Sequence, residues 1–361
     1  DSATVMSSTI TSILNRSLES RTFPKIWKQG KVAALFKSGD RLDSNNYRPI
    51  TVLPTISKIL ERAVHQQLYT YLQDHKILST KQFGFRSKLS TTSALIHFTD
   101  NILLNLDEKR ITGAAFIDLS KAFDTVDHNL LMSKLKSIGV CNQELDWFSS
   151  YLLNRKQLTV VGNCKSPAAE VKIGVPQGSI LGPLLFLVFV NDLPTCLQHC
   201  ELVMYADDTV IYYSGSLKNV EHCINSDLSR LAVWFSDNRL TLNIPKSKFM
   251  VFGTAQSANF KSAQAICAQL NGTALERTKN FKYLGVIVNE NMSWADQVDL
   301  ISKKINQRIG VIRRVSKIVP LDSRVTLYNS LVAPLFDYGD IIWGDKNNET
   351  LMKDLQLLQN K

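Results

Sequence analysis

The order of apolar and polar positions predicts a chain that alternates between helices and short strands. Apolar residues recur every three or four positions through 56–74 and 91–106, which is the spacing of an amphipathic helix. The stretches 113–119 and 202–213 are rich in β-branched and aromatic residues and predict strands, the second one folded around a tight turn. Mixed elements in this order indicate an α+β fold.

The rest of the chain gives shorter elements by the same criteria. Residues 184–190 are all apolar and predict a helix, opened by Pro183, that is buried on every side. We further predict helices at 1–20, 130–138, 219–238 and from 294 to the end, strands at 31–36, 158–161 and 171–175, and a strand pair at 281–288.

Composition and charge favour a globular protein with a polyanionic partner. Hydrophobic residues make up 44% and charged residues 20% of the 361 positions, which excludes a disordered chain. Lys and Arg outnumber Asp and Glu by 42 to 32, and the net charge of +10 suits nucleic acid first and an anionic membrane second. Composition alone also fits a basic protein without such a partner. The longest apolar run, Leu184–Val190, is far shorter than the about 20 residues of a spanning helix, so we expect no membrane partner.

The six cysteines and the N-terminus point to an intracellular protein, nuclear or cytoplasmic, rather than a secreted one. The cysteines lack the close regular spacing of a disulfide framework, and the first residues lack the basic and apolar regions of a signal peptide. Five side chains with zinc-ligand chemistry flank the acid pair at 207–208: Cys196, His199, Cys200, His222 and Cys223. No Cys-x-x-Cys pair occurs and the neighbours are apolar, so we expect ordinary side chains there.

Three carboxylates are the strongest candidates for chemistry. Asp118 ends a predicted strand, and Asp207 and Asp208 stand together in the predicted tight turn. Adjacent acids repel each other, and desolvation adds to the cost. Mg²⁺ relieves this repulsion because it takes carboxylate oxygens as ligands. Two such ions about 4 Å apart can activate a 3′-hydroxyl and stabilise a leaving pyrophosphate. Taken alone, the acid pair also fits a solvated turn.

Several motifs stand in a fixed order around these acids. They are Phe116-Ile-Asp118-Leu-Ser-Lys-Ala-Phe123-Asp, then Gly174-Val-Pro-Gln177-Gly178, then Tyr205-Ala-Asp207-Asp208. From about Phe23 to the C-terminus, the chain resembles the reverse transcriptases of non-LTR retrotransposons, the LINE-like group that includes the jockey elements. The resemblance implies a right-hand polymerase fold with an antiparallel palm sheet backed by helices. It places an N-terminal extension and fingers at 1–110, the palm with interleaved fingers segments at 111–293, and a partial thumb at 294–361.

The resemblance also assigns the metal ligands. Asp118 and Asp207 are the metal-binding carboxylates of the family, Asp208 is the second acid of its Tyr-x-Asp-Asp turn, and the Leu119 carbonyl is a further ligand. The implied cofactor is a pair of Mg²⁺ ions, with Mn²⁺ as the alternative.

The nucleotide and its leaving group are assigned to other residues in the same way. Phe123 matches the bulky residue under the sugar of the incoming nucleotide, and its alternative is a core aromatic of the following helix. Gln177 and Gly178 match the loop that contacts the nucleotide and the template. The basic candidates for the triphosphate and the pyrophosphate are Arg48, Lys58 and Arg86, with Lys246 as proton donor and Lys248 as its competitor. The alternative for the arginines is a surface salt bridge.

Primer and template contacts are expected from the last third of the chain. Tyr283, Leu284 and Gly285 match the hairpin that grips the primer end, although simple core packing also explains its aromatic residues. A basic stretch without acids lies on the same helix as an apolar stripe, so one face can pack while another follows a phosphate backbone. Its candidate contacts are Lys304, Arg308, Arg313 and Arg314, and the alternative is a solvated basic face.

The function implied is RNA-directed DNA synthesis from an RNA template, a DNA primer and deoxynucleoside triphosphates. Full-length members of the family usually carry an endonuclease, so we expect one on the missing part of a longer chain. Two alternatives stay open. One is a nucleic-acid-binding remnant without activity. The other is an RNA-dependent RNA polymerase, which usually has Gly where this chain has Ala206 and lacks a bulky residue under the sugar.

Overall fold

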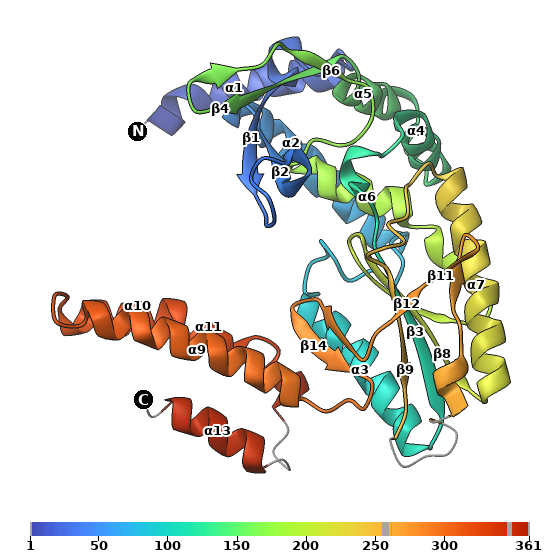
Figure 1. Cartoon of the computed structure of the whole chain (residues 1–361). Coiled ribbons are helices and arrows are strands. Elements are labelled where there is room, and N and C mark those ends of the chain that lie inside the picture. The colour runs from blue at the N-terminus through green and yellow to red at the C-terminus, as the bar shows by residue number, and fades with distance from the viewer. Residues whose placement is uncertain (1, 255–259, 261, 345–348, 360–361) are drawn as a thin grey trace. The chain divides into compact units, whose positions relative to one another are not determined.

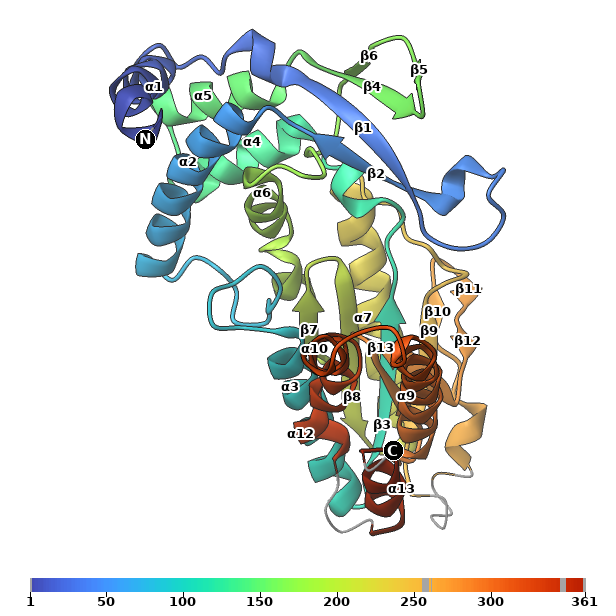
Figure 2. The same ribbon diagram turned by 90° about the vertical axis from the view of Figure 1, so that its left-hand side faces the viewer.

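The computed structural model describes residues 2–254, 260, 262–344 and 349–359 (Figures 1 and 2). The chain divides into two compact units whose segments alternate along the sequence. The first unit comprises 1–85, 119–196 and 231–242, and the second comprises 86–118, 197–230 and 243–361. These units are defined by contacts between residues. The division into fingers, palm and thumb comes from the family resemblance and remains a prediction.

A five-stranded sheet forms one layer of the first unit (Figure 2). Strand β1 pairs antiparallel with β2 and parallel with β4, and β4 also pairs with β5 and β6. The strands are β1 (Gln29–Phe36), β2 (Tyr47–Val52), β4 (Arg155–Val161), β5 (Cys164–Lys165) and β6 (Ala169–Val171). The strand predicted at 171–175 is wrong beyond Val171. Gly174 has a positive φ of 86° and donates its N–H to the Val126 carbonyl, so the chain leaves the ladder there.

Helices form the rest of the first unit. They are α1 (Ser2–Glu19), α2 (Thr55–Asp74), α4 (His128–Ser137), α5 (Asn142–Leu152) and α6 (Leu181–Val190). Short 3₁₀ turns lie between α1 and β1 (Lys25–Lys28), between β1 and β2 (Ser44–Asn46), before α4 (Ala122–Asp124) and after α6 (Leu193–Cys196). As predicted, α6 is buried on every side, with all its residues except Pro183 inaccessible. It begins at Leu181 rather than at Pro183, because proline is tolerated within a first helical turn.

The N–H groups at the N-terminus of α6 donate hydrogen bonds to a carboxylate from α2. The fully buried Glu61 accepts hydrogen bonds from the N–H groups of Ile180 (2.8 Å) and Leu181 (3.3 Å). Ser179 Oγ accepts a third, from the Gly182 N–H at 2.9 Å. Burial raises the pKa of the Glu61 carboxyl, opposed by these hydrogen bonds and by the nearby charge of Arg155. The first N–H groups of a helix lack intrahelical partners, so Glu61 and Ser179 fix where α6 begins.

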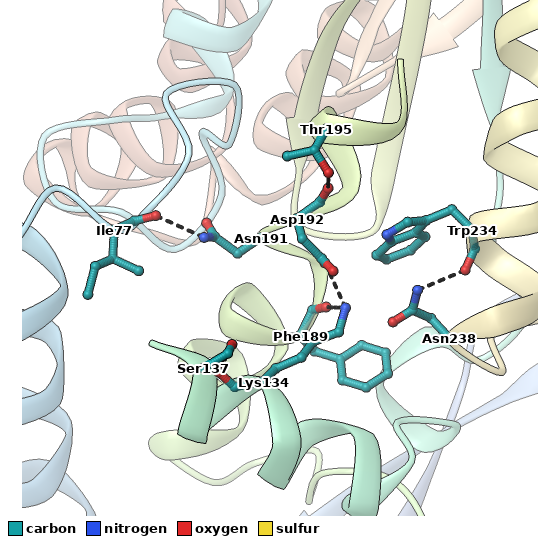
Figure 3. Close-up of polar contacts among 9 residues, drawn as sticks. All are labelled: Ile77, Lys134, Ser137, Phe189, Asn191, Asp192, Thr195, Trp234 and Asn238. Carbon is teal, nitrogen blue, oxygen red and sulfur yellow. Dashed lines mark hydrogen bonds and ion pairs between the residues drawn. The ribbon is translucent and has the colours of Figure 1, made fainter. Parts of the chain in front are cut away.

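The C-terminus of α6 is held by Lys134 of α4 (Figure 3). Its ammonium donates to the Phe189 carbonyl (2.7 Å) and to Asp192 Oδ1 (2.6 Å), and it lies 4.7 Å from the ring centre of Trp234. Asn191 donates to the Ile77 carbonyl at 2.8 Å. Both ends of α6 are therefore anchored, which fixes the loop that precedes it.

The second unit is built on the sheet β12-β9-β3-β8-β7, antiparallel except for the pair β12–β9. Its strands are β3 (Ile111–Ile117), β7 (Glu201–Tyr205), β8 (Asp208–Gly215), β9 (Lys248–Phe252) and β12 (Glu276–Arg277). The central strand β3 is buried along its whole length, as its apolar sequence predicts.

Helices cover both faces of this sheet (Figure 1). On one face, Phe98 of α3 (Thr91–Asp107) packs edge-to-face on Phe116 of β3, with ring centres 5.8 Å apart. On the other face, a Cβ at Gly113 would lie 2.8 Å from Val220 of α7 (Leu217–Asp237). Because side chains alternate along a strand, these two contacts identify the even-numbered residues of β3 with the α3 face.

Two small hairpins and a helical C-terminal part complete the second unit. The hairpins are β10 (Gln269–Leu270) with β11 (Thr273–Ala274), and β13 (Asn280–Tyr283) with β14 (Val286–Asn289); Ala263–Ala265 forms a 3₁₀ turn. The helices are α9 (Ala295–Val315), α10 (Leu321–Leu331), α11 (Ala333–Asp337), α12 (Asp340–Trp343) and α13 (Glu349–Gln359). As predicted, α9 buries an apolar stripe that includes Val298, Ile301, Ile305 and Ile309. Among the described helices, none is both long and apolar enough to cross a bilayer.

Candidate active site

Asp118 directly follows the buried strand β3 and has a fixed backbone. Its N–H donates to Ser247 Oγ (3.0 Å), and its carbonyl accepts from the Asn243 N–H (2.9 Å). Ser247 Oγ in turn donates to the Asn243 carbonyl at 2.9 Å. The half-buried Asp118 carboxylate itself makes no hydrogen bond to any described residue. The segment 243–247 therefore positions this acid while leaving its oxygens available for a ligand.

Asp207 and Asp208 lie at the β7–β8 hairpin. Tyr205 and Asp208 are the last paired residues, so Ala206 and Asp207 form a two-residue loop. Ala206 has a φ of 58°, the left-handed first position that glycine usually takes in a type II′ turn. Such a conformation costs a non-glycine residue of order 1–3 kcal/mol. The strained residue, Ala206, therefore lies in the turn that carries the two acids.

Asp118 and Asp208 both adjoin the last pair of the β3–β8 ladder, which is Ile117 with Thr209. Side chains alternate along a strand, and the even-numbered residues of β3 share the face of Phe116. On that face α3 and the hairpin β13–β14 pack. The three acids thus gather at one end of the sheet in the second unit.

The donor chemistry of these acids fits a divalent cation. Mg²⁺ in phosphoryl-transfer sites is commonly held by one or two carboxylates, with water and substrate phosphates completing its shell. Within the described residues, no group of three or more His, Cys, Asp or Glu side chains is arranged to hold a metal ion by itself. Leu119 belongs to the first unit and forms an isolated antiparallel β-bridge with Leu242. The role of its carbonyl as a metal ligand remains a prediction.

The Cys and His residues around 196–223 have a different environment. The rings of His199 and His222 are centred 6.4 Å apart. Burial and then the Asp227 carboxylate raise the pKa of the Cys200 thiol, which disfavours the thiolate that zinc binds. The expectation of ordinary side chains there remains a prediction.

The structure separates the two lysine candidates for proton transfer. Lys248 Nζ pairs with Glu276 (2.5 Å) and also donates to the Pro245 carbonyl (2.9 Å). Lys246 is exposed and forms no ion pair with a described residue. Lys246 is therefore the better candidate, because its ammonium is not already neutralised.

Phe123 lies in the 3₁₀ turn Ala122–Asp124 of the first unit, before helix α4 begins at His128. Its half-buried ring stacks on Phe186 of α6, with centres 4.3 Å apart and planes at 23°. Phe85 meets the same ring edge-on at 6.1 Å. The ring is thus clamped by aromatic neighbours without being a fully buried core residue.

Gln177 is held by an acid that the sequence did not single out. Its Nε2 donates to both carboxylate oxygens of Asp124, at 2.8 and 2.9 Å, and its carbonyl accepts from the Thr51 N–H at 2.7 Å. Burial raises the pKa of the Asp124 carboxyl, opposed by the Gln177 hydrogen bond and by Lys121. Gly178 has a φ of 116°, and a Cβ there would lie 2.4 Å from the Thr51 carbonyl oxygen. Only glycine fits this approach.

The candidates for triphosphate binding are divided between the two units. Arg48 is exposed on β2 and Lys58 is half-buried in the first turn of α2, and neither forms an ion pair with a described residue. The salt-bridge alternative therefore finds no support for Arg48. Arg86 is half-buried and belongs to the second unit.

The hairpin β13–β14 supports the core-packing alternative for Tyr283, and its primer contact remains a prediction. The Tyr283 ring is core, because it is buried against Phe98 and Phe116. Burial and then the Asp208 charge raise its pKa. Leu284 and Gly285 both have positive φ, as in a type I′ turn, and Tyr338 Oη donates to the Leu284 carbonyl at 2.6 Å. Gly285 is exposed in this turn and Leu284 is half-buried.

Basic side chains gather beside this hairpin. Burial and then the charges of Lys282 and Arg308 lower the pKa of Lys304, so these three cations lie close together. Arg308 donates to the Leu331 carbonyl at the end of α10, which gives it a structural role as well. Arg313 and Arg314 are exposed in the last turn of α9.

The chain is similar to known proteins over most of its length. The profile of the family described as "Reverse transcriptase (RNA-dependent DNA polymerase)" matches residues 35–288. The "Probable RNA-directed DNA polymerase from transposon BS" of Drosophila melanogaster is 31% identical over 97% of the chain and 39% of its own length. The "RNA-directed DNA polymerase from mobile element jockey" of Drosophila funebris is 28% identical over 97% of the chain and 38% of its own length. The chain thus spans about two fifths of these relatives.

A solved structure supports the fold. Telomerase from Candida tropicalis, in complex with a fragment of telomeric RNA, superposes with a TM-score of 0.52 at 11% identity, covering 92% of this chain and 57% of that one. The predicted right-hand polymerase fold is confirmed.

Proposed function

Because the chain belongs to the reverse transcriptase (RNA-dependent DNA polymerase) family, we propose that it copies an RNA template into DNA by adding deoxynucleotides to a primer 3′-hydroxyl. The observation that carries the proposal is the grouping of the three acids. Asp118 and Asp208 both adjoin the last pair of the β3–β8 ladder, and Asp207 shares the turn with Asp208. Backbone hydrogen bonds hold Asp118 in place, and its carboxylate oxygens are left to bind a metal ion.

The acids would hold two divalent ions, Mg²⁺ or Mn²⁺, which when bound supply activation of the 3′-hydroxyl and neutralisation of the leaving pyrophosphate. The other residues act on the nucleotide. Phe123, fixed by its stacking on Phe186, limits the space under the sugar. Gln177, fixed by Asp124, contacts the nucleotide or the template base. Lys246 donates a proton to the pyrophosphate. We assign this role to Lys246 rather than Lys248 because its ammonium forms no ion pair with a described side chain.

The primer is assigned to the second unit. The turn at Leu284–Gly285, whose glycine is exposed, lies on a hairpin that packs over the sheet face of Phe116. Lys282 and Lys304 add positive charge beside it, which suits the phosphates of the primer strand. Arg313 and Arg314 extend the basic surface along α9 towards the duplex that would form.

The test is extension of a labelled DNA primer on an RNA template with Mg²⁺ and either deoxynucleotides or ribonucleotides. We expect extension with deoxynucleotides at a rate far above that with ribonucleotides. Efficient extension with ribonucleotides would support an RNA-dependent RNA polymerase instead. Tight RNA binding without extension by either set would identify a binding remnant.

A further inference from the structure

The segment that follows helix α11 lies against the hairpin β13–β14 within the second unit. It begins at Tyr338 and continues into α12, which lies beside α3 (Figure 2). The Tyr338 hydroxyl donates to the Leu284 carbonyl at 2.6 Å and lies 3.0 Å from Oγ1 of Thr91, the first residue of α3. One side chain therefore connects the turn of the hairpin with the beginning of the helix that packs on the same sheet face.

The backbone of Tyr338 is itself held from both sides. Its N–H donates to the Pro334 carbonyl at 3.2 Å, and its carbonyl accepts from Nε1 of the buried Trp343 at 2.9 Å. The next residue, Gly339, has a φ of 69°, a conformation that glycine adopts without strain. A Cβ at Gly339 would lie 3.3 Å from the Val286 side chain of the hairpin, so the backbone passes close to β14. The tyrosine side chain therefore extends from a fixed backbone.

The Tyr338 ring also packs directly on the turn. A Cβ at Gly285 would lie 3.0 Å from ring atom Cε1 and 3.2 Å from the hydroxyl oxygen, so a larger residue at this position would push the ring away. Leu284 has a φ of 43° and Gly285 a φ of 90°, and two successive positive φ values are those of a type I′ turn. The turn thus contacts Tyr338 both through a hydrogen bond and through the face of its glycine.

This hydrogen bond favours one of two related turns. A type II′ turn has a positive φ at its first central position but not at its second, so the two types differ mainly by rotation of the central peptide. In this hairpin the central peptide is formed by the Leu284 carbonyl and the Gly285 N–H. Its rotation would carry the carbonyl away from Tyr338 and break the bond. Since C=O and N–H point in opposite directions in a trans peptide, the rotation would also replace a donor by an acceptor on the far side of the turn.

We propose that Tyr338 is a positioning residue that holds the Leu284–Gly285 turn in its type I′ form and, resting on the proposed function, that it thereby orients the primer end. The Gly285 N–H forms no hydrogen bond with a described residue. It faces away from the Tyr338 hydroxyl, because the carbonyl of the same peptide faces towards it. A backbone donor suits the phosphates of a strand, whereas a carbonyl in its place would repel them. Tyr338 acts through the turn and not on the primer itself.

The experiment compares Tyr338→Phe, which removes the hydroxyl and keeps the ring, with the wild type in single-turnover extension of a DNA primer on RNA. One hydrogen bond is worth roughly 2- to 13-fold in an equilibrium constant, so the extension rate should fall by about this factor. The amplitude of the turnover and the KM of the deoxynucleotide should stay unchanged. The matched control is Tyr328→Phe in α10, which removes a hydroxyl that bonds no described residue and should not slow extension.

Leu284→Asn tests whether the effect passes through the turn. Asn-Gly is a preferred sequence of type I′ turns, so this change favours the same form without the Tyr338 hydroxyl. Tyr338→Phe should therefore slow extension less in the Leu284→Asn background than in the wild-type background. Equal slowing in both backgrounds would overturn the proposal. A lower amplitude and melting temperature at an unchanged rate would also overturn it, because the tyrosine would then serve stability alone.

Hydrogen exchange of the free protein separates failure of this proposal from failure of the proposed function. The backbone amides of β13 and β14 should exchange faster in Tyr338→Phe than in the wild type or in Tyr328→Phe, whether or not the chain extends a primer. Unchanged exchange would show that Tyr338 does not hold the turn, even if the wild type extends. Faster exchange in Tyr338→Phe, with a wild type that does not extend, would refute the proposed function and leave the role of Tyr338 in the turn established.

Discussion

Replacing Phe123 by Val tests how the chain selects its sugar. In the folded protein the Phe123 ring stacks on Phe186 at 4.3 Å and meets Phe85 at 6.1 Å, so it cannot move aside without disturbing both. If this ring lies under the nucleotide sugar, as proposed, it leaves room for hydrogen at carbon 2 but not for a hydroxyl. Val keeps a branched apolar side chain and removes the outer part of the ring.

The expected magnitude follows from the packing. Forcing one extra heavy atom into a close-packed site typically costs about 1–3 kcal/mol. At 1.36 kcal/mol per tenfold in rate, this corresponds to a preference of roughly 5- to 150-fold for deoxynucleotides. The variant also loses ring contacts, and because Phe123 is only half-buried we expect a stability loss of about 1–2 kcal/mol, below the 3–5 kcal/mol of a fully buried Phe→Ala change.

The assay is the ratio of kcat/KM for matched deoxy- and ribonucleotides in primer extension. We expect Phe123→Val to retain DNA synthesis and to lose most of the discrimination. Phe123→Tyr is the matched control, because it keeps the ring and should keep the preference. The reasoning is refuted if Phe123→Val discriminates as strongly as the wild type. Unfolding of Phe123→Val, with Phe123→Tyr intact, would instead show that the ring serves the core.

Two further predictions concern charge. If Arg313 and Arg314 each contact one phosphate, replacing both by Ala should flatten the plot of log affinity for a template–primer against log salt by about two units. An unchanged slope would mean that this end of α9 is only a solvated basic face. Glu61 has a raised pKa in the folded state, so its contribution to stability is complete below its ordinary value of 4.5 and is lost as pH rises through the folded value. The free energy of unfolding of the wild type relative to Glu61→Gln should therefore fall as pH rises above 4.5 in urea titrations, and a difference that stays constant with pH would show that Glu61 does not titrate in this way.

Local patterns in the sequence predicted most of the elements. The apolar run at 184–190 predicted a fully buried helix, and α6 is one. The strands on both sides of Asp207 were evident from their β-branched residues, and the structure confirms β7 and β8. Helix α5 (Asn142–Leu152) was not predicted. The strand predicted through 172–175 failed because Gly174 turns the chain towards Val126, a partner 48 positions earlier that no local pattern reveals.

Candidate site residues that belong to a sequence motif could be predicted. Residues whose role depends on a partner far away in the sequence could not. The acids and Phe123 follow from motif order. Asp124 was missed because its role depends on Gln177, 53 residues away, and Glu61 because it caps a helix whose N–H groups lie 119 and 120 residues away. The choice between Lys246 and Lys248 likewise needed Glu276, which pairs with the second lysine across 28 residues. Only a folded chain brings such pairs together.

The most direct test of the account is single-turnover extension of a DNA primer on RNA by the wild type and by Asp207→Asn in the presence of Mg²⁺. The substitution keeps the shape of the side chain at the β7–β8 turn and removes its charge, so RNA affinity and the melting temperature should stay close to the wild-type values. Loss of a metal-binding carboxylate removes several kcal/mol of transition-state stabilisation, so extension should fall by at least about 10³-fold. Extension by a folded, RNA-binding Asp207→Asn protein at near the wild-type rate would contradict the assignment of these acids as the catalytic centre.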